Sequence, residues 1–188
     1  FADVMAAAST NANTNVTMLG ESFKYCAATA GAMGYNIEDI SVALGVMANA
    51  GIKGSTAGTT LKNVIANMAK PTDAQAAVMQ KLGISLTDSS GNMKSFAEVM
   101  NNLRTSFNGL SETEKASYAT TLAGKESMSG LLTIVNASAA DFDKLTEAIK
   151  YCGSTLVYTQ AAKYTAYAYN VAKRLKILNS FKQLRSAF

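Results

Sequence analysis

The stretch NIEDISVALGVMANAGIKGSTAGTTLKNVIANMAKP, from Asn36 to Pro71, decides the fold of this chain. Apolar residues in its first half recur every three or four positions, the period of one helix face, at Ile37, Ile40, Leu44 and Met47. Asn36 is a suitable N-cap for this helix, because its side chain can accept a hydrogen bond from a free backbone N–H. Gly51 stands where a glycine in the left-handed conformation would end the helix.

The second half of the stretch predicts another helix, with Ser55 as its N-cap. Pro71, the only proline of the chain, ends this helix near Lys70, because a proline disfavours helical conformation in the residue before it. The residues predicted to face the core are Leu61, Val64, Ile65 and Met68.

A short connection rich in small residues joins the two predicted helices. Gly51 and Gly54 supply the conformational freedom of a tight turn. Ala57 and Gly58 have too little bulk to hold two helices apart. We therefore expect a tight helix–loop–helix corner in which the two flanking helices approach closely.

The same glycines, with a lysine and a serine, also suggest a phosphate-binding loop. That motif requires a glycine, four residues, and then Gly-Lys-Ser or Gly-Lys-Thr at the start of a helix. Here Lys53 precedes Gly54, and no apolar β-branched strand leads into the motif. A second near match, residues 124–127, has Glu126 where the hydroxyl residue belongs. The sequence therefore predicts no nucleotide site, no cofactor and no small-molecule substrate.

Composition favours an α-rich protein without histidine-based chemistry. The chain has 188 residues, 48% of them hydrophobic, with one proline and no tryptophan. It contains no histidine, which removes Ser-His-Asp, Cys-His and His-metal arrangements. Cys26 and Cys152 are too few to form a four-ligand zinc site. We expect both cysteines to be reduced and buried, with a disulfide between them as the alternative.

Helical periodicity extends over most of the remaining chain. Thr72 and Ser111 are predicted N-caps, and Ser111 starts a capping box with Glu114. Predicted core stripes lie at Met18, Leu19, Phe23, Cys26 and Ala27; at Phe96, Val99, Met100, Leu103 and Phe107; at Met128, Leu131, Leu132 and Val135; and at Phe142, Leu145 and Ile149.

One segment breaks the helical period. In GISLTDSSGNMKS, apolar and polar residues alternate before the turn signal that starts at Asp88. We therefore predict one small β-hairpin, from Ile84 to Lys94, packed on a helix because an isolated hairpin is only marginally stable.

The C-terminal part has a different charge. Residues 150–188 contain seven basic residues, no acidic residue and five tyrosines, whereas the whole chain has a net charge of +4. A long amphipathic helix is predicted there, with an apolar stripe at Tyr164, Tyr167, Val171, Leu175, Leu178 and Phe181. We divide the chain into a helical domain, residues 1–149, and this basic helix, residues 150–188. The helix could pack on a partner chain, face nucleic acid or lie on a membrane surface.

Five segments together resemble the core region of phage tail tape measure proteins. These are ADVM near the start, LGESFKY from Leu19, the stretch from Asn36 to Pro71, KLGISLTDSSGNMKSFAEVMNNLR from Lys81, and GLSETEKASYATTLAGKESMSGLLTIVNAS from Gly109. The resemblance extends from about Ala2 to Ile149. The basic, tyrosine-rich residues that follow are outside the family pattern.

The resemblance implies a structural virion protein rather than an enzyme. Members lie in the tail lumen or tip of a phage or a phage-tail-like particle assembled in the host cytoplasm. They set tail length during assembly, and they leave the tube at genome delivery. The implied partners are other copies of the protein and other tail proteins, with transient DNA or host-membrane contact as an addition.

The resemblance also implies that this chain is the N-terminal part of a longer protein. Its glycine breaks argue against one continuous helix, so we expect a folded docking module rather than the ruler itself. The alternative is an interaction module of a phage-tail-like particle whose basic helix faces DNA or a membrane. A cell-wall hydrolase is the least favoured function, because polar residues do not cluster around any one acidic residue.

Overall fold

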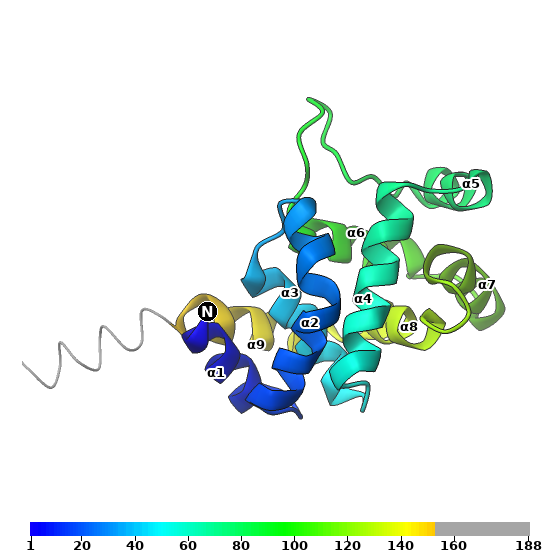
Figure 1. Cartoon of the computed structure of the whole chain (residues 1–188). Helices are drawn as coiled ribbons and strands as arrows, with labels where there is room; N and C mark the ends of the chain where they lie inside the picture. Colours follow the sequence, from blue (N-terminus) through cyan, green and yellow to red (C-terminus); the bar gives the residue numbers. More distant parts are fainter. Residues whose placement is uncertain (153–188) are drawn as a thin grey trace, which may run out of the picture. The chain divides into compact units, whose positions relative to one another are not determined.

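The computed structural model describes residues 1–152, which form mainly α-helix (Figure 1). Nine helices occur in this part of the chain: α1 (Ala2–Asn11), α2 (Val16–Ala32), α3 (Ile37–Asn49), α4 (Gly54–Ala69), α5 (Asp73–Leu82), α6 (Phe96–Phe107), α7 (Glu112–Ala123), α8 (Met128–Asn136) and α9 (Ala139–Lys150). The prediction of a helical fold is confirmed. The long helix predicted for residues 150–188 lies, from residue 153 onward, outside the described residues.

Capping residues begin several helices where the sequence predicts. The Asn36 side chain accepts a 2.7 Å hydrogen bond from the Asp39 backbone N–H at the start of α3. Thr72 and Ser111 begin α5 and α7, and each takes part in a capping box. Helix α4 ends at Ala69, as predicted from Pro71.

Helix α3 lies at the centre of the domain. Every residue from Ser41 to Ala48 is buried, so α3 is covered on all sides and not on one face alone. Helices α1, α2, α4, α6, α8 and α9 all pack against it. Gly45 permits close packing there, because a Cβ atom on it would lie 3.3 Å from Leu145 in α9. Phe1–Lys150 form one compact unit around this helix.

Most predicted core residues are buried. The exceptions lie on α2 and α8 and at Ile37, which is half-buried at the start of α3. The stripes of α4, α6 and α9 are buried throughout. In α2, Leu19, Phe23 and Cys26 are buried, but Met18 and Ala27 are exposed because that helix presents one side to solvent. In α8, the predicted residues Met128 and Leu132 are only half-buried.

The predicted β-hairpin does not form a pair of strands. Residues 84–95, which we call the arm, contain a single antiparallel bridge between Thr87 and Met93. Figure 1 shows the arm extending away from the helices, and its residues from Thr87 to Met93 are exposed. A strand pair needs a surface to pack on, and here only Ile84, at the base of the arm, is buried.

Candidate functional site

The glycine-rich stretch singled out in the sequence forms the connection from α3 to α4. Gly51 has a φ of 88° and ends α3, as predicted. The Gly51 N–H donates to the Ala48 carbonyl oxygen at 3.0 Å, and the Ile52 N–H donates to the Met47 carbonyl oxygen at 2.9 Å. These two bonds satisfy carbonyl groups that a helix end leaves free. No atom lies within 4 Å of a Cβ placed on Gly51, so its role there is conformational.

The N-cap predicted for α4 is wrong by two residues. Lys53 occupies the cap position, and Ser55 lies inside the helix with an exposed side chain. Gly54 follows with a φ of 58°, a left-handed conformation that glycine adopts without steric cost. The Gly54 carbonyl oxygen lies 2.8 Å from the Ser22 hydroxyl of α2, which holds the start of α4 against α2.

Gly58 permits a close helix contact, but with α2 and not with the preceding helix. A Cβ atom on Gly58 would lie 2.1 Å from the Ser22 carbonyl oxygen. Ala57 beside it is buried. The sequence indicated which residues lack bulk. It did not indicate the residue that they contact, Ser22, which lies 36 positions before Gly58 in the chain. The predicted approach of the two flanking helices at this point is therefore corrected to an approach of α4 to α2.

A second close contact, on another side of α4, was missed by the sequence analysis. A Cβ atom on Gly130 of α8 would lie 2.5 Å from the Thr60 side chain. Nearby, the Asn63 amide donates to the Ser127 hydroxyl at 2.9 Å, and the Asn67 amide donates to the Leu122 carbonyl oxygen at 2.9 Å. Gly130 stands inside a helix, where glycine is unfavourable. This unfavourable position is the feature of the sequence that could have indicated a close contact.

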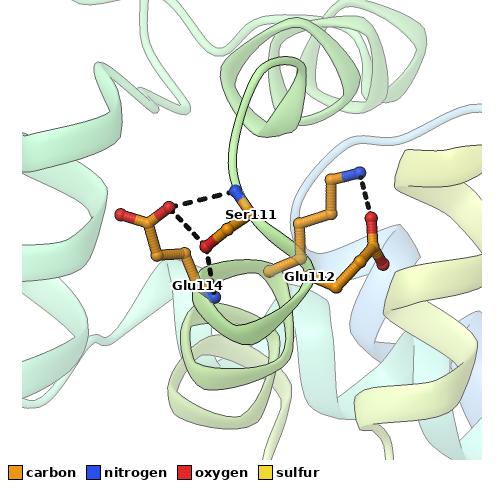
Figure 2. A network of polar contacts seen from close by, with 4 residues as sticks. Ser111, Glu112 and Glu114 are labelled. Atoms are coloured by element: carbon orange, nitrogen blue, oxygen red, sulfur yellow. Dashed lines mark hydrogen bonds and ion pairs between the residues drawn. The ribbon is translucent and has the colours of Figure 1, made fainter.

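Two acidic side chains at the start of α7 serve a helix end and a local ion pair. Figure 2 shows Glu114 bonded to the hydroxyl and the backbone N–H of Ser111, with the Ser111 hydroxyl also near the Glu114 N–H. The bond from the Ser111 hydroxyl, followed by the backbone bond, lowers the pKa of the Glu114 carboxyl. Glu112 pairs with Lys115 at 2.9 Å. These carboxylates lie on exposed helix surfaces rather than facing one another across a cleft.

Cysteine, aspartate and glutamate are the candidate metal ligands among residues 1–152. That part of the chain has no group of three histidine, cysteine, aspartate or glutamate residues able to hold a metal ion. Cys26 and Cys152 are both free thiols, so the alternative of a disulfide is wrong for this structure. Cys26 is buried, and burial raises the pKa of its thiol to about 11, whereas Cys152 is only half-buried.

Two neighbouring hollows flank the connection from α8 to α9. One, of about 580 Å³, lies between α3, α8 and the start of α9 and is lined in part by Val46, Leu132 and Asp141. The other, of about 430 Å³, includes Arg104 and Lys115. The Arg104 guanidinium donates to the Ala137 carbonyl oxygen at 3.0 Å, and Lys115 already pairs with a carboxylate. Both cations therefore have partners within the domain.

The remaining predicted interaction residues lie beyond the described part of the chain. These are Tyr164, Tyr167, Val171, Leu175, Leu178 and Phe181. Within residues 1–152, no helix is long and apolar enough to cross a membrane.

Comparisons with known proteins point to phage tails. The family model described as phage-related minor tail protein matches residues 1–124. A tape measure protein of Pneumococcus phage Dp-1 is 40% identical over 148 residues, covering 79% of this chain and 13% of that protein. A probable tape measure protein of Escherichia phage P2 is 30% identical over 135 residues, covering 70% of this chain and 17% of that protein. The chain thus spans less than a fifth of either relative. No solved structure matches it significantly.

Proposed function

The chain belongs to the family of phage tail tape measure proteins, and from that premise we propose that it forms a folded docking module rather than the length-measuring part. The observation that supports this proposal is the buried helix α3, which six other helices cover. A domain of 150 residues has a radius of gyration of about 15 Å, whereas the same residues in one continuous helix would span about 225 Å. A compact domain contributes little length to a ruler.

Within the whole protein, this module would anchor the tape measure to other tail proteins and to other copies of itself. The predicted apolar stripe from Tyr164 to Phe181 is the segment proposed for contact between copies. Its surrounding basic residues would add weak, sequence-independent contact with DNA or with a host membrane. The whole protein would set tail length during assembly and leave the tube at genome delivery, in a phage or in a phage-tail-like particle.

A catalytic role for this module is not part of the proposal. A glycoside hydrolase requires two carboxyl groups on either side of one bond. In residues 1–152, Glu98 and Glu114 serve capping boxes, and Glu21 and Glu112 pair with lysines. A robust cell-wall hydrolysis signal from the purified chain would contradict this part of the proposal.

Tail length measured by electron microscopy distinguishes a docking module from a ruler. The test variant is the full-length protein without residues 1–150, and it replaces the unmodified protein during assembly of the particle to which that protein belongs. We expect assembly to fail or its yield to fall, while the tails that do form keep their normal length. A control deletes a segment of equal length from a predicted continuous helix elsewhere in that protein, and it should shorten tails. Tails shortened by about 225 Å after removal of residues 1–150 would instead identify this segment as part of the ruler.

A further inference from the structure

The arm carries a pair of backbone edges that face opposite directions. The Asp88 N–H donates to the Asn92 carbonyl oxygen at 2.9 Å, and the Lys94 N–H donates to the Leu86 carbonyl oxygen at 2.8 Å. These two bonds enclose the bridge between Thr87 and Met93. In this antiparallel pattern, the backbone N–H and C=O groups of the two bridged residues point outward, one residue to each edge.

The two edges differ in how their polar groups are satisfied. At Thr87, the Ser85 hydroxyl donates to the carbonyl oxygen at 2.8 Å and accepts from the N–H at 3.2 Å. Ser85 thus closes that edge from within the chain. The N–H and C=O of Met93 make no hydrogen bond within the described residues. Its side chain is 44% exposed, one of the most exposed large apolar side chains of this part.

We propose that the open edge at Met93 pairs with the same edge of a second copy of this chain. The two arms would run antiparallel, with Met93 opposite Met93 of the second copy. Each Met93 N–H would donate to the carbonyl oxygen of the other, which satisfies all four free backbone groups. The result is a small sheet of four short segments, closed at both outer edges by Ser85.

Side chains in the arm are compatible with this register. Pairing centred on Met93 places Lys94 beside Asn92 of the second copy, so like charges do not meet. The Asn92 amide donates to the Asp88 carboxylate at 3.2 Å. Within an arm, Asp88 lies opposite Asn92. Directly opposite residues of paired strands share a face, so Lys94 and Asp88 of the second copy lie on the same face with Asn92 of that copy between them. The two methionine side chains would cover each other in the centre.

The position of the arm also favours pairing between copies. Figure 1 shows the arm reaching beyond the surrounding helices, so two arms can meet before the helical domains collide. An exposed edge is commonly protected by charge, proline or a covering segment. Ser85 provides such protection at Thr87. At Met93 the backbone groups are uncovered, and only the charge of the adjacent Lys94 flanks them. This contact is separate from the stripe of residues 164–181 and does not depend on it.

Matched proline substitutions test the proposal in the full 188-residue chain. Met93→Pro removes the N–H of the open edge, and Thr87→Pro removes the N–H of the closed edge. Proline is tolerated where an edge N–H points outward, and both substitutions leave the two internal arm bonds in place. We expect Met93→Pro to raise the dissociation constant of self-association about tenfold or more, and Thr87→Pro to leave it unchanged. Sedimentation velocity over a concentration series measures the dissociation constant of each variant. Circular dichroism checks that the helix content is preserved.

Hydrogen exchange supplies a second readout that needs no substitution. The Met93 amide of the unmodified chain should exchange slowly at high concentration and rapidly after dilution. A chain that stays monomeric, or a Met93 amide that exchanges rapidly at every concentration, would overturn the proposal. Association that persists unchanged in Met93→Pro would also overturn it, and would leave contact through residues 164–181 as the explanation consistent with the proposed function.

Discussion

Helix α3 and the segment from α5 to the end of the arm, residues 73–95, are held in place by different forces. Residues Ser41–Ala48 are all buried, and the contacts of α3 are predominantly apolar. Helix α5 has no buried residue. It is held by a capping box at Thr72, by a hydrogen bond from the Gln75 amide to the Thr121 carbonyl oxygen at 3.1 Å, and by a contact between Lys81 and Tyr118.

This difference teaches where stability and where adaptability lie in the module. Each fully buried aliphatic side chain contributes about 1.5–3 kcal/mol, so the centre depends on packing. Hydrogen bonds at the surface contribute about 1 kcal/mol each, so the peripheral segment can open without unfolding the centre. The proposed docking role would benefit from both, because a fixed core presents a segment that can adjust to a partner.

The largest expected effect comes from truncating the core of α3. Leu44→Ala should destabilise the domain by about 3–5 kcal/mol, because it leaves a cavity in a close-packed interior. Leu82→Ala in α5 removes the same atoms from a half-buried position and should cost about 1 kcal/mol or less. Urea denaturation of the two variants measures the difference. Equal losses would contradict the contrast between centre and periphery.

The next effect concerns the contact between α2 and α4. Gly58→Ala should cost about 2–3 kcal/mol, because the new Cβ would meet backbone atoms of Ser22 that cannot move independently. Gly31→Ala is the matched control, since Gly31 is also helical and no atom lies within 4 Å of its Cβ position. The control should be neutral or stabilise by up to about 1 kcal/mol, because alanine favours helix. If Gly58→Ala were as well tolerated as Gly31→Ala in urea denaturation, the helices would not approach as described.

A smaller effect is expected from the capping boxes at the surface. Ser111→Ala should cost about 1 kcal/mol through loss of the N-cap. The folded state lowers the pKa of Glu114 and, through bonds from Ser95, that of Glu98. Stability from these carboxylates is therefore present above their unfolded pKa and is lost as the pH falls through their folded pKa. Unfolding of Ser111→Ala measured from pH 7 downward should show a weaker acid dependence than the unmodified chain, and an identical dependence would exclude this role for Glu114.

The smallest effect is expected at Lys53. Its side chain makes no capping hydrogen bond, so Lys53→Ala should change stability by less than about 0.5 kcal/mol. The sequence contains no phosphate-binding motif at this position, so titration calorimetry should show no nucleotide binding in either form. A nucleotide affinity that disappears in Lys53→Ala would show that the glycine-rich connection binds phosphate after all.

Sequence periodicity predicted the elements well, but not the contacts between distant elements. All five apolar residues of the α6 stripe are buried, because spacing along one helix determines which side chains share a face. The pattern of α3 indicated one buried face, whereas its small residues Ala43 and Gly45 make the opposite side suitable for packing as well. Periodicity marks the most apolar face and does not show that another helix covers the rest.

Gly58 and the arm show why some features of the structure could not be predicted from the sequence. A residue without bulk permits a close approach, but the sequence near Gly58 does not say that Ser22 is the partner. Alternation in the arm indicated a strand pair, yet strand pairing also needs a surface to cover it, and that surface depends on the tertiary fold. Both errors concern information that local sequence does not contain.

Native-state hydrogen exchange of the full chain tests the contrast between α3 and residues 73–95 most directly. Amides of α3 from Ser41 to Ala48 should exchange only through global unfolding, with a free energy equal to that from denaturant titration. Amides of α5 and the arm should exchange far faster under the same conditions, through local opening. Comparable protection of both regions, or rapid exchange in α3, would contradict an account in which a buried helix fixes the module and its periphery remains adaptable.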